Sequence, residues 1–151
     1  MAATTAERLK PVIRMAEQAE QEAIRLLGQG QQQVSQAEFK LNELNRYYQD
    51  YQQQWLSRGA RGVSGPWLMN YQRFLSQMEV AIAQQQRSLA WHQDHLEKLR
   101  QQWQQRHARL EGLQRLVERQ LQEARRMADR REQKMLDEFC QRQAGRPDHS
   151  G

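Results

Sequence analysis

The sequence contains little of what a compact core or a β-sheet is built from. Only 38% of its 151 residues are hydrophobic and the mean hydropathy is −1.06, which leaves too little apolar area for a layered core. Valine and threonine, which favour strands, are scarce, and there are only three prolines and eight glycines. Glutamine, arginine, glutamate and leucine dominate, which is typical of long helices with a solvated exterior and a narrow apolar seam.

Other absences exclude further classes of protein. No apolar run approaches the ~20 residues that cross a bilayer, and the N-terminus lacks the apolar block of a signal peptide, so we expect a cytoplasmic chain without a transmembrane segment. The one cysteine, Cys140, cannot form an internal disulfide, and no Cys-x-x-Cys pair suggests zinc or redox chemistry. The net charge of +5 comes from arginines interleaved with acids, which indicates solvated, salt-bridged helix faces.

The apolar residues between 67 and 139 recur at alternating steps of three and four, which predicts a coiled-coil seam. They are Leu68, Tyr71, Leu75, Met78, Ile82, Leu89, Leu96, Leu99, Trp103, Leu110, Leu113, Val117, Ala124 and Met127. Polar residues share this register, where they weaken packing but can fix the pairing or admit water. They are Gln85, His92, Arg106, Gln120 and Arg131.

Residues 9 to 55 show the same steps less regularly. The positions are Ile13, Ala16, Ala19, Ala23, Leu26, Val34, Ala37, Leu41, Leu44, Tyr48, Tyr51 and Trp55. We interpret the gap between Leu26 and Val34 as a one-residue slip of register that contains Gly28 and Gly30. Each glycine costs about 1 kcal/mol relative to alanine inside a helix, so we expect the first helix to be softest there.

Both patterns stop in a stretch with three glycines and a proline, which predicts a hairpin turn. We expect an all-α, long two-helix antiparallel coiled-coil hairpin: helix 1 over about 5–57, a turn over 58–66 and helix 2 over about 67–143. This forms one domain over 1–143, followed by a disordered tail at 144–151.

The helix ends carry recognisable signals. Ser64 or Gly65 is suited to cap the second helix, with Pro66 in its first turn. Thr4 and Glu7 have capping-box spacing, but a proline at position 11 would then fall inside the first helix. That helix therefore either kinks at the proline or begins near it.

No residues assemble into a catalytic, metal or cofactor site. His92, His95 and His107 share one helix, but none has a histidine four residues away with a glutamate between, as a helical zinc site requires. There is no glycine-rich phosphate loop, and an extended hairpin offers no concave pocket in which pKa values could be tuned. We expect no enzyme activity, no cofactor and no metal.

One surface near the turn is not needed by the seam itself. Tyr47 and Phe74 fall outside the seam, and folding about residue 62 places Tyr47 and Tyr51 across from Phe74 and Met78. The same pairing brings residues 44 and 81 together. Clustered aromatic side chains on a polar helix favour a docking surface, while the alternative is a locally wider seam that buries them.

A second candidate surface follows from the unequal arms. The first helix ends opposite residue ~119, so the segment from 120 to 143 should overhang without a partner. This segment is basic and amphipathic, which favours a partner protein or an acidic cavity, while the alternative is a frayed, solvated tip. Its candidate contact residues are Arg125, Arg126, Arg130, Arg131, Lys134, Met135 and Phe139.

The segments that carry a family resemblance are Arg25-Leu26-Leu27-Gly28, Gln36-Ala37-Glu38, Leu41, Leu44, Tyr47, Tyr51, Trp67, Asn70-Tyr71-Gln72, Phe74, Glu79, Ala81-Ile82, Gln133-Lys134 and Asp137-Glu138-Phe139. In these segments the sequence resembles the family of the flagellar export protein FliJ of proteobacteria. Their order and spacing agree through most of the chain, with departures at Pro11 and around the loop.

This resemblance implies a non-enzymatic component of the flagellar type III export apparatus, at the inner face of the cell membrane. In that family the end bearing both termini enters the ring of the export ATPase FliI as a central stalk and promotes its assembly. The family also contacts the export gate protein FlhA and handles export chaperones. The positions that correspond to the gate-docking patch are Leu44, Tyr47, Tyr51, Phe74, Met78 and Ala81, and the overhang corresponds to the ring-binding end.

Two other functions are compatible with the pattern. The basic cluster from 125 to 134 suits a nucleic-acid-binding arm, although its interspersed acids and the lack of a reader fold argue against one. A generic coiled-coil adaptor that dimerises through an exposed seam is the other. We expect a monomer or a weak self-associate, because the hairpin already buries most of its seam, and no nucleic-acid partner.

Overall fold

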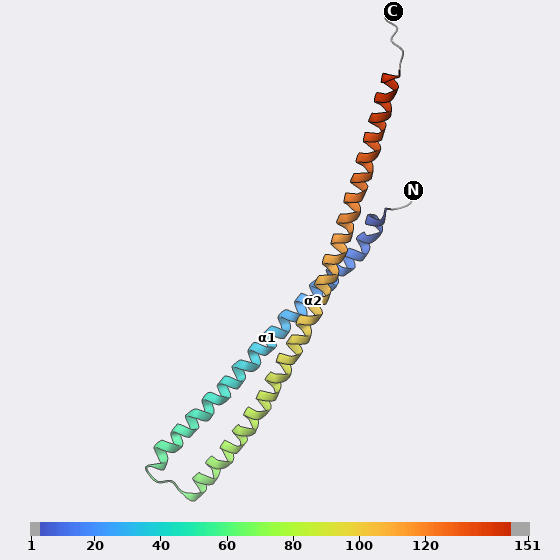
Figure 1. Cartoon of the computed structure of the whole chain (residues 1–151). Coiled ribbons are helices and arrows are strands. Elements are labelled where there is room, and N and C mark those ends of the chain that lie inside the picture. Colours follow the sequence, from blue (N-terminus) through green and yellow to red (C-terminus); the bar gives the residue numbers. More distant parts are fainter. Residues whose placement is uncertain (1–3, 146–151) are drawn as a thin grey trace, which may run out of the picture. The chain divides into compact units, whose positions relative to one another are not determined.

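The computed structural model describes residues 4–145, which form two long helices and no strand. Helix α1 spans Thr5–Gly59 and helix α2 spans Gly65–Ala144, with residues 60–64 between them (Figure 1). The all-α helical hairpin predicted from the sequence is thereby confirmed. At the turn, α1 ends two residues later and α2 begins two residues earlier than expected, and α2 also ends one residue later. Of the expected tail, Ala144 ends α2, and residues 146–151 lie outside the described part of the chain.

The first helix begins at its capping box. The Thr4 hydroxyl accepts a hydrogen bond from the Glu7 backbone N–H at 3.2 Å, and the Glu7 carboxylate accepts one from the Thr4 N–H at 3.4 Å. These two bonds satisfy backbone donors that have no helical partner. Pro11 lies inside α1, so a helix start near Pro11 is wrong. The reciprocal cap stabilises the turn that precedes Pro11, and the proline removes one backbone hydrogen bond of α1.

The turn uses one glycine for its conformation and one serine for its cap. Gly62 has φ = 79°, a left-handed conformation that residues with a Cβ adopt only with strain. The Ser64 hydroxyl accepts a hydrogen bond from the Trp67 N–H at 3.3 Å, and its carbonyl accepts one from the Leu68 N–H at 3.1 Å. Ser64, rather than Gly65, is therefore the N-cap of α2.

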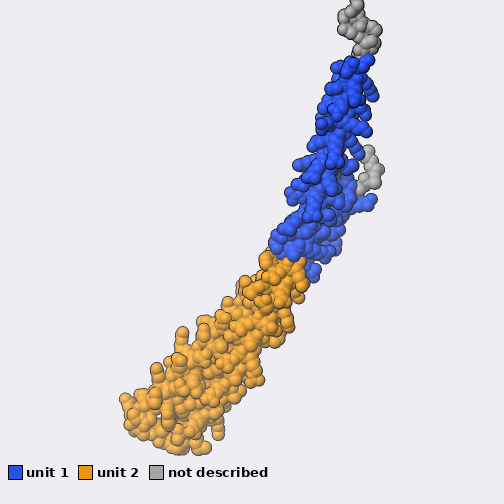
Figure 2. Space-filling view, viewed as in Figure 1, with its two compact units in different colours: residues 1–20, 106–151 blue, residues 21–105 orange. Residues whose placement is uncertain are grey.

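The contacts divide the chain into two compact units, coloured separately in Figure 2. Unit 1 consists of Met1–Glu20 and Arg106–Gly151, and unit 2 consists of Gln21–Gln105, which includes the turn. In unit 1 the buried apolar residues are Ala16 and Leu110. In unit 2 they are Ala23, Ala37, Met78 and Leu99. No polar side chain among residues 4–145 is buried, so the interior of each unit is a thin apolar seam.

Small residues occupy every seventh position of α1, and this corrects the expected register slip. Ala16, Ala23, Gly30 and Ala37 are all buried, so the heptad runs unbroken through the segment between 26 and 34. Gly30 belongs to the seam, where a Cβ would lie only 2.7 Å from Leu99 Cδ1. The apolar pattern missed it because glycine has no side chain to count.

The seam of α2 follows the expected positions up to residue 120, with one exception. Gln85, His92 and Gln120 are partly buried as expected, but Arg106 is exposed and the neighbouring His107 is partly buried in its place. Past residue 120 every described side chain is exposed, as expected for an overhang. No helix among residues 4–145 has the length and apolar character needed to cross a membrane.

Candidate functional site

The aromatic patch, defined as Leu44, Tyr47, Tyr51, Phe74, Met78 and Ala81, lies in unit 2 where the two helices approach the turn. The rings of Tyr51 and Phe74 are in contact, with centroids 4.5 Å apart and planes tilted by 46°. Tyr47 lies one helical turn before Tyr51 and therefore shares its face of α1. The structure thus brings Tyr51 and Phe74 together, as the pairing rule predicted.

The members of the patch differ in how far their side chains are exposed to a partner. Tyr47 is 57% exposed and Phe74 is also exposed, so a locally wider seam does not bury them. Met78 is only 7% exposed and lies in the seam, where it supports the patch and has little surface left for a partner. Leu44, Tyr51 and Ala81 are partly buried. A docking partner would therefore meet Tyr47, Phe74 and the open side of Tyr51.

A stack of three aromatic rings continues this surface towards the turn. Trp55 and Trp67 stack at 5.8 Å, and Tyr71 stacks against them at 5.2 and 5.3 Å respectively. The Arg58 guanidinium carbon lies 5.9 Å from the Trp67 ring centroid, within cation–π range. We refer to Trp55, Trp67 and Tyr71 as the turn stack.

Two tyrosine hydroxyl groups lock the helices together around the patch. The Tyr71 hydroxyl donates to the Tyr51 carbonyl at 2.8 Å, and burial raises the pKa of Tyr71. The Tyr48 hydroxyl donates to Glu79 Oε1 at 3.0 Å, and this bond to a carboxylate is the main reason that the pKa of Tyr48 is raised. Both phenols stay neutral at physiological pH and act as fixed donors.

A shallow pocket joins the aromatic patch to the turn stack, and the site prediction missed part of it. Its lining consists of Tyr51, Gln54, Arg58, Trp67, Asn70, Tyr71 and Phe74. Sequence reasoning assigned no site role to Gln54, Arg58, Trp67 or Asn70. Helical spacing could have found them, because residues 67, 70 and 74 lie on one face of α2 and residues 47, 51, 54 and 58 on one face of α1.

The second candidate surface lies on α2 in unit 1, past residue 120. The basic segment, residues 125–134, carries five basic and two acidic side chains, a net charge of +3. All of its side chains are exposed, and none of the ion pairs among residues 4–145 involves a residue of this segment. Arg126, Arg130 and Lys134 are spaced four apart and form a ridge along one face.

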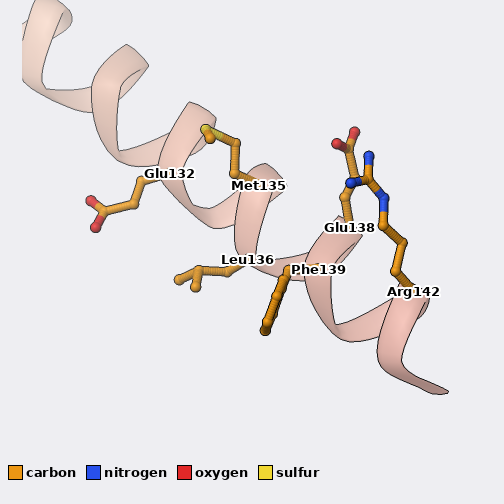
Figure 3. A pocket seen from close by; sticks show the side chains of 6 residues that line it. All are labelled: Glu132, Met135, Leu136, Glu138, Phe139 and Arg142. Carbon is orange, nitrogen blue, oxygen red and sulfur yellow. The ribbon is translucent and has the colours of Figure 1, made fainter.

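Apolar side chains follow the basic segment on the same helix. Figure 3 shows the side chains that line a shallow pocket on the surface of α2. Leu136 and Phe139 lie close together on one side of the helix, and Met135 is the residue before Leu136. The remaining lining residues are Glu132, Glu138 and Arg142. Met135, Leu136 and Phe139 are all more than half exposed, so no part of the described chain covers them. Leu136 was not among the predicted contact residues.

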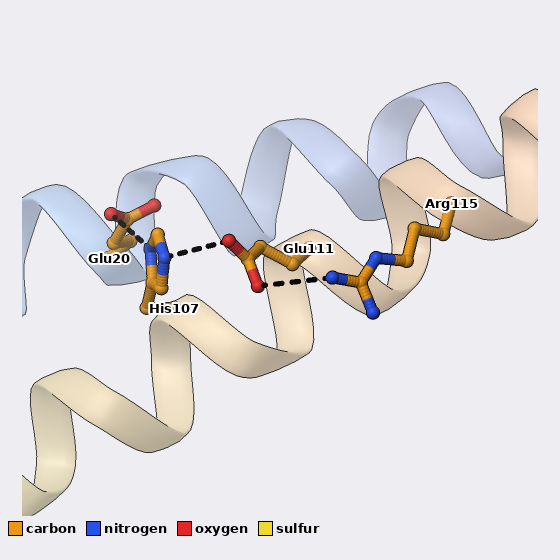
Figure 4. Close-up of polar contacts among 4 residues, drawn as sticks. All are labelled: Glu20, His107, Glu111 and Arg115. Carbon is orange, nitrogen blue, oxygen red and sulfur yellow. Dashed lines mark hydrogen bonds and ion pairs between the residues drawn. The ribbon is translucent and has the colours of Figure 1, made fainter.

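A charged cluster ties α1 to α2 within unit 1 (Figure 4). His107 Nδ1 lies 3.1 Å from Glu20 Oε1, and His107 Nε2 lies 3.0 Å from Glu111 Oε1. Arg115 extends the cluster at 3.8 Å from the other oxygen of Glu111. The hydrogen bond to Glu20, helped by the charges of both carboxylates, raises the pKa of His107. The shift favours the protonated form of the ring, which can donate to both carboxylates and so bridge the two helices.

No set of side chains in the described part of the chain is arranged to hold a metal ion. His92 and His95 instead pack against Trp91, with ring centroids 5.1 and 5.0 Å away. The chemistry available at both candidate surfaces is non-covalent: apolar contact, cation–π contact and ion pairing.

Comparison with known proteins gives one consistent result. A family model described as "Flagellar FliJ protein" matches residues 5–148. The chain is 33% identical over 132 residues to the Flagellar FliJ protein of Escherichia coli (strain K12), and the alignment covers 87% of this chain and 90% of that protein. It is 32% identical over 132 residues to the Flagellar FliJ protein of Salmonella typhi, with the same coverage. The similarity therefore extends over both helices and the turn.

Proposed function

The chain belongs to the flagellar FliJ protein family, and we propose that it is a non-enzymatic component of the flagellar protein export apparatus with two protein-binding surfaces. One is the aromatic patch, which docks on the export gate protein FlhA. The other is the exposed end of α2, which enters the ring of the export ATPase FliI and promotes its assembly. Handling of export chaperones, at the inner face of the cell membrane, belongs to the same proposal.

The observation that carries the proposal is the helix beyond residue 120. Twenty-five consecutive described residues, 121 to 145, are exposed, although they include Leu121, Met135 and Phe139. An amphipathic helix without a partner leaves apolar area in water, and burying that area would contribute about 25 cal/mol of free energy per Å². Insertion into a ring would cover that area on all sides at once, whereas a groove would cover only one face.

Basic side chains suit the same role. Arg126, Arg130 and Lys134 form a ridge whose charges are not neutralised by ion pairs within the described chain. Acidic groups lining a ring would pair with this ridge and set the orientation of the helix. Since the segment also carries acids, the pairing is selective rather than a uniform attraction.

A pair of double variants tests the two surfaces separately. Met135→Ser with Phe139→Ser removes exposed apolar area from α2, and Tyr47→Ala with Phe74→Ala removes the exposed rings of the patch. ATP hydrolysis by the purified export ATPase and binding to the cytoplasmic part of the gate are measured for both. Each variant is the matched control for the other, because all four side chains are exposed and none supports the seam.

The expected result is a crossed loss. The α2 variant should no longer stimulate ATP hydrolysis but should still bind the gate, and the patch variant should do the reverse. Loss of both activities in one variant would mean that the two surfaces are not independent. If neither variant changes either activity, the assignment of both surfaces is wrong.

A nucleic-acid-binding arm is the second candidate, and the unpaired basic segment is the observation that favours it. Such binding would weaken steeply with salt. Fluorescence anisotropy with labelled duplex DNA across a salt titration decides this, and binding that persists at physiological salt and is lost in Arg126→Gln with Arg130→Gln would support the arm.

A further inference from the structure

The turn end of the hairpin carries no negatively charged side chain. Between Asp50 and Glu79 there is no acidic residue, while Arg58, Arg61 and Arg73 are all present. The basic segment of α2, by contrast, has Asp129 and Glu132 among its basic residues. The turn is therefore positively charged in both helix ends and in the loop, within unit 2 alone.

Several apolar side chains at the same end are exposed. Leu56 in the last turn of α1 is 71% exposed, Met69 near the start of α2 is 65% exposed, and Val63 lies exposed in the loop. None of the three packs in the seam. Arg58, Arg61 and Val63 also line a shallow hollow with Trp67.

The indole of Trp67 is held in place at this end. It stacks against both Trp55 and Tyr71 in the turn stack, and the Arg58 guanidinium lies over its ring. A fixed, partly exposed tryptophan next to arginine and aliphatic side chains is the composition that settles at the boundary between lipid headgroups and acyl chains. The arginines face anionic headgroups, while the aliphatic side chains enter the boundary.

We propose that this turn-end surface, formed by Leu56, Arg58, Arg61, Val63, Trp67 and Met69, binds anionic lipid bilayers peripherally. It differs from the aromatic patch, which uses Tyr47, Tyr51 and Phe74 on the sides of the helices, and it goes beyond the proposed function. A lipid surface is the favoured partner. Its anionic headgroups would attract the arginines, which have no acidic neighbours between Asp50 and Glu79, and its acyl boundary would accept the scattered aliphatic side chains.

The basic segment of α2 is the obvious competitor for the same lipid. It has more basic residues, but Asp129 and Glu132 lie among them and Asp137 and Glu138 follow directly. Those carboxylates are repelled by an anionic surface and reduce the attraction of their neighbours. The segment therefore provides a matched control with the same type of side chain.

Vesicle co-sedimentation of the full chain tests the proposal. Phosphatidylcholine vesicles are compared with vesicles of phosphatidylcholine mixed with phosphatidylglycerol, and binding is expected only to the mixture. Arg58→Gln with Arg61→Gln should lower the partition coefficient about twenty-five-fold, since each arginine near an anionic surface contributes about five-fold. Arg125→Gln with Arg126→Gln removes the same charge and should leave binding nearly unchanged.

Several outcomes would overturn the proposal. Absence of binding to the mixed vesicles would do so directly, and so would an equal loss in both double variants, which would mean that only net charge matters. Failure to bind vesicles combined with binding of the gate protein through Arg58 and Arg61 would assign the turn to a protein partner. Because the vesicles contain no flagellar protein, the vesicle results do not depend on the proposed function.

The single cysteine allows a second readout. Cys140 is exposed on α2 and can carry an environment-sensitive fluorophore in the natural chain. The matched chain carries Val63→Cys with Cys140→Ser and the same fluorophore in the loop. On mixed vesicles the emission should shift to the blue for the label at 63 and stay unchanged for the label at 140. The reverse pattern would place the membrane contact on α2.

Discussion

Two glycines separated by one residue in α1 should respond differently to the same substitution. Gly28 and Gly30 both lie inside the helix, and neither has a positive φ. An alanine Cβ at 28 would meet nothing within 4 Å, so Gly28→Ala should stabilise the hairpin by about 1 kcal/mol through helix propensity alone. At 30 the same Cβ would lie 2.7 Å from Leu99 Cδ1 and 3.4 Å from Leu96 Cδ1.

The contact at Gly30 decides the sign there. Carbon atoms pack at about 3.5–4.0 Å, so Leu99 Cδ1 must shift by about 1 Å within the seam. Overpacking of this kind costs about 1–3 kcal/mol, which cancels or exceeds the gain in helix propensity. Gly30→Ala should therefore be less stable than Gly28→Ala by about 1–3 kcal/mol.

Thermal unfolding followed by far-ultraviolet circular dichroism measures the difference. For a chain of this size 1 kcal/mol corresponds to a Tm shift of about 2–4 °C. Gly112→Ala is a further control, because a Cβ there also meets open space. Combining each substitution with Leu99→Ala should reveal coupling for residue 30 and none for residue 28. Equal stabilisation by Gly28→Ala and Gly30→Ala would refute close packing at Gly30.

Three further predictions concern the ionisable cluster, the turn and the core. Because the pKa of His107 is raised, its contribution to stability is complete below the ordinary value of 6.5 and is lost as pH rises through the raised pKa. The difference in unfolding free energy between the natural chain and His107→Gln should therefore shrink with rising pH. An unchanged difference would contradict this. Ser64→Ala should lower the unfolding free energy in urea by about 1 kcal/mol, while Ser57→Ala, which removes no cap, should not. Met78→Ala should cost about 2–5 kcal/mol in the same assay, and exposed Met69→Ala less than ~0.5 kcal/mol; similar costs would mean that Met78 is not in the seam.

The sequence alone predicted most of the fold because the fold is a repeated local pattern. Alternating steps of three and four identified both helices, and the glycines with Pro66 identified the turn. The pattern failed where a position is defined by shape instead of hydrophobicity. Gly30 lies in the seam because of its small size, and His107 replaces Arg106 there because Glu20 on the other helix pairs with it. Neither fact is visible within one helix.

The candidate surfaces were predicted less completely, for a related reason. Pairing about the turn correctly brought Tyr51 to Phe74, but it could not tell exposed Tyr47 from buried Met78. Exposure depends on the rotation of each helix about its axis. The stacking of Trp67 on Trp55 and Tyr71 was also missed, since ring planes depend on side-chain torsions that spacing does not determine.

A hairpin of two helices gives each residue only one neighbouring helix against which to pack, and this limit explains where binding surfaces arise. Alanine and glycine at positions 16, 23, 30 and 37 fit such a thin interface completely, whereas Leu44 and Tyr51 continue the same heptad with larger side chains and are only partly buried. Aromatic rings near the turn and apolar side chains beyond residue 120 therefore exceed what the hairpin can cover. Replacing the exposed members Tyr47, Phe74, Met135 and Phe139 with alanine should cost the isolated chain little stability, so a loss of binding in such variants would reflect the surface itself and not the fold.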